Sequence, residues 1–352
     1  MSINIKLLKE ICEVAGVPGF EHRIREVVLR EVRPLVDEVR VDNMGNVIAI
    51  KKGLNDKKIM IAAHMDEIGF IVKHIDDNGF IYFHTLGGFD PKTLTAQRVI
   101  LHGREDVTGV MGSKPVHLMD DEEKKRLPQT KDYFIDTGMT KSAVMELISI
   151  GDPISRERTL IEMGECVNCK SIDNRVSVFI LLEALRELQN IPNPLPYDVY
   201  SVFTVQEEVG LRGAMVAAHG IEPDFGFGLD TTIAFDVPGA KPDEMITKLG
   251  GGAAIKIMDS SAICDYRMVR YMKETADKNN IKWQPEVLTG GGTDTAGMQR
   301  MSTRGVIAGA ISIPTRHIHQ VIEMANKEDI RAAIELLKAC ISDLDQFDWD
   351  FK

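Results

Sequence analysis

Imidazole and carboxylate side chains stand where several apolar runs of the sequence end. Four runs, at residues 59–63, 199–205, 225–229 and 306–313, are closely followed by such residues, and another carboxylate directly precedes a predicted helix. The residues at these places are His64, Asp173, Glu207, Glu208, Asp230 and His319. Ligands of open α/β sheets bind outside the carboxyl ends of the strands, so we expect these side chains to converge from distant parts of the chain.

Such a concentration of acidic groups needs a cation. Carboxylates that lie close together repel one another, and one of them would bind a proton unless divalent metal ions neutralised the charge. Mixed histidine and carboxylate ligands suit zinc or cobalt better than calcium or magnesium, which prefer oxygen ligands. The sequence therefore predicts two divalent metal ions, about 3.5–4 Å apart, that share one carboxylate. The assignment is His64 and Asp230 for one ion, Glu208 and His319 for the other, and Asp173 for both.

Two further acids lie next to the predicted ligands. Asp66 stands two residues after His64, so both side chains point to the same face of an extended chain, and Asp66 can orient the site. Glu207 adjoins the ligand Glu208. A free carboxylate beside a metal-activated water can act as a general base and later give the proton to a leaving amine.

Five segments that contain these residues resemble, in the same order, the motif set of the tetrahedral aminopeptidases. The segments are residues 63–69, 171–175, 205–210, 228–230 and 314–319. This family of dinuclear metallopeptidases holds glutamyl, leucyl, lysyl and deblocking aminopeptidases, and some members carry the label cellulase or endoglucanase. Five motifs in the same order are far more specific than one alone, and the resemblance extends over nearly the whole chain.

The resemblance implies roles for the site residues and an assembly. By position, the metal ligands of the family fall on the five residues assigned above, the catalytic base on Glu207 and the supporting acid on Asp66. The family also implies a small inserted β domain that mediates dimerisation, and dimers that form a hollow tetrahedral dodecamer admitting only short peptides. One departure is His317, where members commonly have tyrosine; it stands two residues before His319 and is an alternative ligand.

The spacing of apolar residues predicts the elements that position these groups. Helices are expected over residues 5–15 and 21–32, and strands at 39–41, 46–50 and 58–63. Between residues 68 and 164, short strand-like runs alternate with turns, which indicates a small all-β unit of barrel-like form. Its clearest runs are residues 70–75, 80–84 and 98–102. The charged stretch at residues 120–126 is expected to be a solvated loop or short helix.

Beyond residue 174, helices and strands alternate. Helices are expected near residues 176–188, 211–219, 265–277 and 327–344, and strands near 199–205, 225–229 and 305–312. This alternation predicts an α/β fold with a mostly parallel sheet flanked by helices, similar to that of zinc peptidases. We expect a catalytic domain in two parts, residues 1–67 and 165–352, interrupted by the dimerisation domain at residues 68–164.

The composition disfavours some partners and compartments. The 352 residues carry a formal net charge of −11, which disfavours nucleic acid and anionic lipid as partners. Apolar stretches stay below the ~20 residues that a membrane-spanning helix needs, and the first residues lack signal-peptide features, so we expect a cytoplasmic protein. The five cysteines, an odd number, suit unpaired thiols, and Cys166 and Cys169 lack the second pair of a zinc ribbon.

The residues taken together predict a metalloaminopeptidase that hydrolyses the first peptide bond of short peptides. One alternative is a glycosidase that uses two carboxylates, but 2 Trp and 6% aromatic residues offer little surface for stacking on sugars, and the histidines would have no role. Another alternative is a non-catalytic scaffold that binds metal ions. Glu207 counts against it, because metal affinity does not require this residue. The glycine-rich residues 290–294 are expected to form tight backbone near the substrate cleft.

Overall fold

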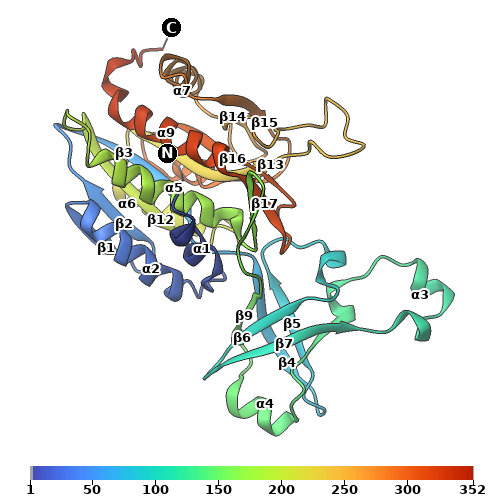
Figure 1. Ribbon diagram of the computed structural model, residues 1–352. Helices are drawn as coiled ribbons and strands as arrows, with labels where there is room; N and C mark the ends of the chain where they lie inside the picture. The colour runs from blue at the N-terminus through green and yellow to red at the C-terminus, as the bar shows by residue number, and fades with distance from the viewer. Residues whose placement is uncertain (1–2, 352) are drawn as a thin grey trace.

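The computed structural model describes residues 3–351, which form a large sheet flanked by helices and a smaller closed barrel (Figure 1). The large sheet has 11 strands, nine of them in the order β1-β2-β12-β3-β13-β16-β17-β11-β10, with β14 beside β16 and β15 beside β14. The strands are β1 (Glu38–Val41), β2 (Val47–Lys51), β3 (Asn55–His64), β10 (Ile161–Met163), β11 (Cys166–Cys169), β12 (Tyr197–Thr204), β13 (Phe225–Ile233), β14 (Ala253–Met258), β15 (Trp283–Val287), β16 (Ile307–Arg316) and β17 (Glu323–Asn326).

The sheet is mixed, so the prediction of a mostly parallel sheet is wrong. The four adjacent strands β12, β3, β13 and β16 are parallel, but β2 joins β12 antiparallel, and β17, β11 and β10 continue antiparallel beyond β16. Antiparallel neighbours need only short connections, whereas parallel neighbours need long crossovers. The crossover helices are visible in the apolar pattern of the sequence. The short outer strands have no sequence pattern that indicates which neighbour they pair with or in which direction.

Helices cover both faces of this sheet. On one face lie α1 (Ile5–Glu13), α2 (His22–Val32), α5 (Ile172–Leu188), α7 (Tyr266–Lys278) and α9 (Lys327–Ser342), and on the other lie α6 (Arg212–Ile221) and α8 (Asp294–Met301). Because both faces are covered, the central strands are apolar over most of their length rather than alternating. The regular part of α5 begins after Asn174, close to the predicted residue 176, since Asp173 and Asn174 have non-helical dihedral angles.

The barrel has its own hydrophobic core. Its strands close in the order β4-β5-β8-β7-β6-β9, and they are β4 (Gly69–Ile75), β5 (Ile81–Leu86), β6 (Arg98–His102), β7 (Asp106–Ser113), β8 (Tyr133–Asp136) and β9 (Pro153–Arg156). Phe70, Ile81, Leu101 and Ile135 are among the side chains that fill it. These strands lie within the unit predicted at residues 68–164, although β7, β8 and β9 were not expected. The domain boundaries themselves stay a prediction.

Two short helices decorate the barrel, α3 (Asp121–Lys125) and α4 (Lys141–Leu147). α3 occupies the charged stretch that was expected to be a loop or short helix. It begins with a capping box between Asp120 and Glu123 and buries none of its side chains. The five cysteines are unpaired, as predicted. No helix within residues 3–351 is long and apolar enough to span a membrane.

A hydrogen-bonded network ties the barrel to α2. Arg23 donates two hydrogen bonds to Asp106, at 2.6 and 2.7 Å. His102 Nδ1 lies 2.8 Å from Asp106 Oδ1, and its Nε2 lies 2.8 Å from Ser155 Oγ. This pattern resembles a serine hydrolase triad, but Ser155 is only 2% exposed and cannot meet a substrate. The network is a structural brace.

Candidate metal centre

The candidate site lies where the parallel strands end. Because β3, β12, β13 and β16 run in the same direction, their carboxyl ends meet at one edge of the sheet, where a cleft of about 840 Å³ opens. Each strand brings a predicted residue to this edge: His64 from β3, Glu207 and Glu208 after β12, Asp230 from β13 and His319 after β16. β13 continues to Ile233, so Asp230 lies within the strand rather than directly after it.

One group of side chains surrounds the imidazole of His64. Its Nε2 atom lies 3.5 Å from Asp173 Oδ1, 3.7 Å from Asp230 Oδ1 and 3.7 Å from Glu207 Oε2. Ligand atoms about 2.1 Å from a common zinc ion, at tetrahedral angles, stand about 3.4 Å apart. The spacing around His64 is therefore that of a ligand cage. Glu207, predicted as a base, reaches the same space as Asp230.

Asp173 lies between the two imidazoles. Its Oδ1 atom faces His64, while its Oδ2 atom lies 3.4 Å from His319 Nε2. His319 Nε2 in turn lies 3.5 Å from Glu208 Oε2. The structure thus brings all five predicted ligands together, with Asp173 between the two imidazoles. The assignment of each residue to one ion stays a prediction.

The acids of the site lack enough partners of their own. Asp173 Oδ1 and Glu208 Oε1 are buried and accept no hydrogen bond from any described residue. Buried carboxylate oxygens without a donor are costly, and a divalent cation would satisfy both. The donor set of imidazoles and carboxylates therefore fits such an ion.

Protonation of the imidazoles reflects the same excess of negative charge. Burial alone would lower the pKa of His64, but the carboxylates of Glu207, Asp173 and Asp230 raise it well above its usual range. The pKa of His319 is likewise raised against burial, to about 9, by Glu208 and Asp173. Burial raises the pKa of Glu208 to about 8. Protons thus neutralise part of the charge wherever cations do not.

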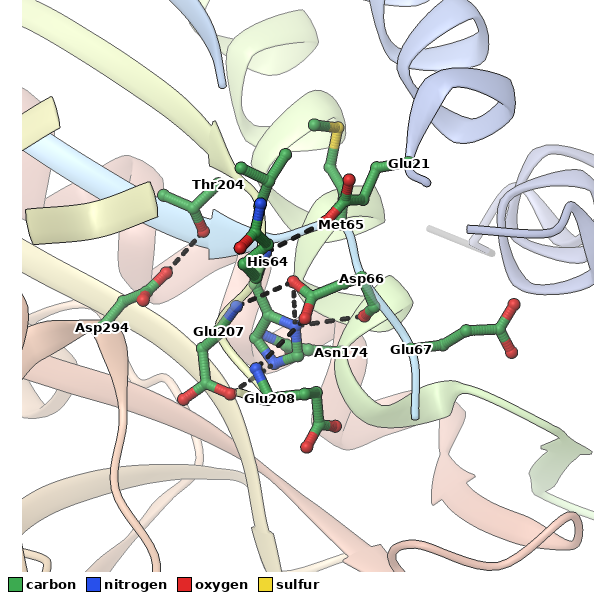
Figure 2. Close-up of polar contacts among 12 residues, drawn as sticks. Glu21, His64, Met65, Asp66, Glu67, Asn174, Thr204, Glu207, Glu208 and Asp294 are labelled. Atoms are coloured by element: carbon green, nitrogen blue, oxygen red, sulfur yellow. Dashed lines mark hydrogen bonds and ion pairs between the residues drawn. The ribbon is translucent and has the colours of Figure 1, made fainter. Parts of the chain in front are cut away.

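Asp66 supports the site through three neighbours, as Figure 2 shows. Its Oδ1 atom accepts a hydrogen bond from the main-chain N–H of Glu207, and its Oδ2 atom accepts one from that of Glu208, both at 3.1 Å. Its Oδ1 atom also lies 3.4 Å from His64 Nδ1. Asp66 is completely buried. It lies where the sequence predicted a supporting acid, and it fixes the main chain that carries two site residues.

Two buried acids near the site were not predicted. Glu323, at the start of β17, accepts main-chain hydrogen bonds from Asp173 and His319, both at 2.9 Å. Asp294 accepts a hydrogen bond from Thr204 at 2.5 Å, and burial raises its pKa to about 7 (Figure 2). A partial sequence signal for Asp294 was its place after the glycines at 290–292, which line the cleft. No sequence signal pointed to Glu323, because its hydrogen-bond partners are main-chain groups.

The alternative ligand His317 lines the cleft but does not join the cage. Of the two imidazoles in this loop, only His319 lies within 4 Å of a carboxylate among the described residues. The chain turns sharply here, since both His317 and His319 have a positive φ, 61° and 63°. The turn places their side chains differently, and the geometry favours His319 as the ligand.

Residues 45–336 match the family model for M42 glutamyl aminopeptidase. The chain belongs to this family. A putative aminopeptidase of Acetivibrio thermocellus is 40% identical over 95% of this chain and 97% of its own length. The lysyl aminopeptidase of Pyrococcus furiosus is 32% identical over 99% of both chains. The predicted family is thereby confirmed.

Several solved structures share the fold. The TET aminopeptidase of Thaumarchaeota archaeon SCGC AB-539-E09 superposes with a TM-score of 0.94 at 36% identity, covering 97% of this chain and 96% of its own. The TET1 peptidase of Pyrococcus horikoshii, described as assembling into a tetrahedron or a large octahedral shell, gives 0.85 at 32% identity over 96% and 98%. A Thermotoga maritima structure named endoglucanase gives 0.79 at 29% identity over 96% of both chains.

Replacement of Asp66 by asparagine should weaken ion binding by about 10–100-fold, because an amide accepts only one of the two main-chain hydrogen bonds and repels the other N–H. Titration of the ion-free protein with Co²⁺ measures this. Asp329→Asn is the matched control, since the buried Asp329 also accepts one main-chain hydrogen bond on each oxygen, from Gly250 and Gly252, and does not line the cleft. Equal affinities for Asp66→Asn and the unsubstituted protein would contradict the supporting role.

Binding of divalent ions at pH 7 should release protons. The pKa values of His64 and His319 are raised, to about 9 for His319, so both imidazoles hold protons in the ion-free protein, and an imidazole must be neutral to bind a metal. Proton release is measured by titrating Co²⁺ into weakly buffered protein. It should diminish as the pH rises through 9, and a constant absence of release between pH 6 and 8 would refute the assignment of these imidazoles.

Proposed function

We propose that this protein is an aminopeptidase that removes N-terminal residues from short peptides with the help of two divalent metal ions, zinc or cobalt. The observation that carries the proposal is the position of Asp173 between two imidazoles, with the carboxylate of Glu207 in the same space. His64 and Asp230 would hold one ion, Glu208 and His319 the other, and Asp173 both. The family membership supports the same activity.

When bound, two such ions polarise the scissile carbonyl, lower the pKa of a water molecule and stabilise negative charge in the transition state. The chain supplies the proton transfer. Glu207 faces the site with its Oε2 atom 3.7 Å from His64 Nε2, and its main chain is fixed by Asp66. Its carboxylate takes the proton of the attacking water and gives it to the leaving amine.

The shape and charge of the cleft fit a peptide with a free amino terminus. The carboxylates at its base attract a positively charged amine, whereas Ile233, Phe235 and Leu288 make part of the wall apolar. A volume of about 840 Å³ lies within the range of small-ligand sites. It accommodates the end of a peptide but not a folded chain.

The barrel is proposed to be the dimerisation domain, inserted at residues 68–164, and the dimers to form a dodecamer. Several large apolar side chains in the segment between β7 and β8 of the barrel are exposed, including Val116 at 56%, Leu118 at 69% and Leu127 at 71%. Clustered exposed apolar residues are typical of surfaces that associate. The shells described for the TET1 relative support the same assembly.

Neither alternative function is favoured. The structure named endoglucanase shares this fold, but the chain belongs to an aminopeptidase family. The name of that structure is therefore no evidence for a carbohydrate site in this chain. A non-catalytic scaffold would leave Glu207 without a role, although it is held at the edge of the cage by Asp66.

Glu207→Gln should keep both ions and lower turnover by about 10²–10⁴-fold, because the amide cannot take a proton. Metal content and hydrolysis of aminoacyl anilides measure the two effects separately. Glu183→Gln, which changes a glutamate on α5 that accepts a hydrogen bond from Arg186, is the control and should keep full activity. Undiminished turnover by Glu207→Gln would show that another group is the base.

Removal of metal ions by a chelator should abolish hydrolysis of aminoacyl anilides, and Zn²⁺ or Co²⁺ should restore it. Carboxymethyl cellulose, assayed in parallel, should remain intact. Sugar release that resists chelation would favour the glycosidase, and inactivity on both substrates in the presence of either ion would favour the scaffold. A panel of aminoacyl substrates in the same assay identifies the preferred N-terminal residue.

A further inference from the structure

Glu323 connects the two segments that carry the proposed ligands Asp173 and His319. Its Oε2 atom accepts the main-chain N–H of Asp173, and its Oε1 atom accepts that of His319. Asp173 stands 150 residues away in the sequence, before the regular part of α5, whereas His319 belongs to the loop before β17. The side chain of Glu323 is completely buried. One carboxylate therefore sets the distance between the shared ligand and the imidazole of the second ion.

The His319 segment needs such an anchor. His319 has a φ of 63°, in the left-handed region that side chains other than glycine adopt at a cost. A residue in this conformation persists only where its surroundings fix it. The hydrogen bond to Glu323 is made by the N–H group of His319 itself, so it acts directly on this turn.

Arg156 of the barrel lies near this anchor, since it lines a small cavity together with His319 and Gln320. It lies at the end of β9 and is only 2% exposed, and none of its guanidinium nitrogens donates a hydrogen bond to a protein group within the described chain. The positive charge of Arg156 favours the ionised form of the Glu323 carboxylate, whose two oxygens accept the main-chain hydrogen bonds. A cavity of about 10 Å³, room for one water molecule, lies between Arg156, Phe89 and Gln320.

The other acid close to Arg156 is already neutralised. Glu67 accepts two hydrogen bonds from Lys170, at 2.6 and 2.7 Å, and lies 3.6 Å from Arg175. Glu67 thus has two cations besides Arg156, whereas Arg156 is the main positive charge that acts on Glu323. A buried charge without a partner is strongly unfavourable.

We propose that Glu323 is a positioning residue for the second metal ion, and that the buried positive charge of Arg156 in the barrel favours the ionised carboxylate that this role needs. Glu323 touches neither substrate nor the reacting atoms. It acts by fixing the main chain of Asp173 and His319, as Asp66 does for Glu207 and Glu208. This inference rests on the proposed function, since it presupposes two ions.

Binding of Co²⁺ to the ion-free, full-length protein, followed by calorimetry, tests the proposal. His319→Ala identifies the binding step that belongs to the second ion. Glu323→Gln should weaken that same step by about 10–100-fold and leave the other step unchanged, because glutamine can accept only one of the two main-chain hydrogen bonds. The absorption spectrum of bound Co²⁺ should change for the weakened site alone.

Asp329→Asn is the matched control. Asp329 is equally buried and accepts main-chain hydrogen bonds from Gly250 and Gly252, both at 2.7 Å, without lining the cleft. Asp329→Asn removes the same kind of contact outside the cleft, so its Co²⁺-binding isotherm should match that of the unsubstituted protein. Equal weakening in both variants would show a general loss of structure and would overturn the specific role of Glu323.

A second pair of variants covers the case in which Glu323→Gln does not fold. Arg156→Gln should weaken the second binding step, and Arg156→Lys, which keeps the charge, should restore most of it. Unchanged binding of both ions by Glu323→Gln, or by Arg156→Gln where the first variant does not fold, overturns the proposal while the proposed function stands. If the unsubstituted protein binds fewer than two ions, the proposed function fails, and the positioning role falls with it.

Discussion

An excess of buried negative charge dominates this molecule. Asp66, Asp173, Glu208 and Asp230 meet around two imidazoles at one edge of the sheet, where little water remains to screen them. Carboxylates in such a place stay ionised only when cations or protons compensate for them. The carboxylates raise the pKa values of His64 and His319, which favours protons in that role, and divalent ions would fill it with more charge and stricter geometry. The parallel strands, the turn at His319 and the carboxylates that accept main-chain N–H groups all help to position these charged side chains.

Buried carboxylates also hold the chain in place. Asp66, Glu323 and Asp329 each accept two main-chain N–H groups, and each lies at a point where segments distant in sequence meet. A carboxylate suits this task because both of its oxygens accept, whereas an amide offers one acceptor and one donor. The acids near the cleft therefore fall into two kinds: those that face the proposed ions, and those that fix the chain carrying them.

The barrel takes part in the wall of the site. The loop after β5 approaches the second group of ligands so closely that a β-carbon at Gly88 would stand 3.3 Å from His319 Nδ1, and one at Gly87 would stand 3.3 Å from Glu208 Oε2. Gly87 also has a φ of +91°, which favours glycine. Together with Arg156, these residues connect the proposed dimerisation domain to the ion site. Substitutions in the barrel can therefore affect the proposed ion site directly.

The sequence by itself determined the family, the α/β class with a small β unit, and the residues that gather in the cleft. It did so because apolar runs of central strands end in polar residues, and because the five motifs occur in a fixed order. Tertiary structure alone decided the mixed edges of the sheet, since short edge strands pair with whichever neighbour is free. It also decided the roles of Glu323 and Arg156, which the sequence did not predict. These two roles depend on contacts with main-chain N–H groups and on burial. Neither has a signature in the types of residue involved, so the sequence did not indicate them.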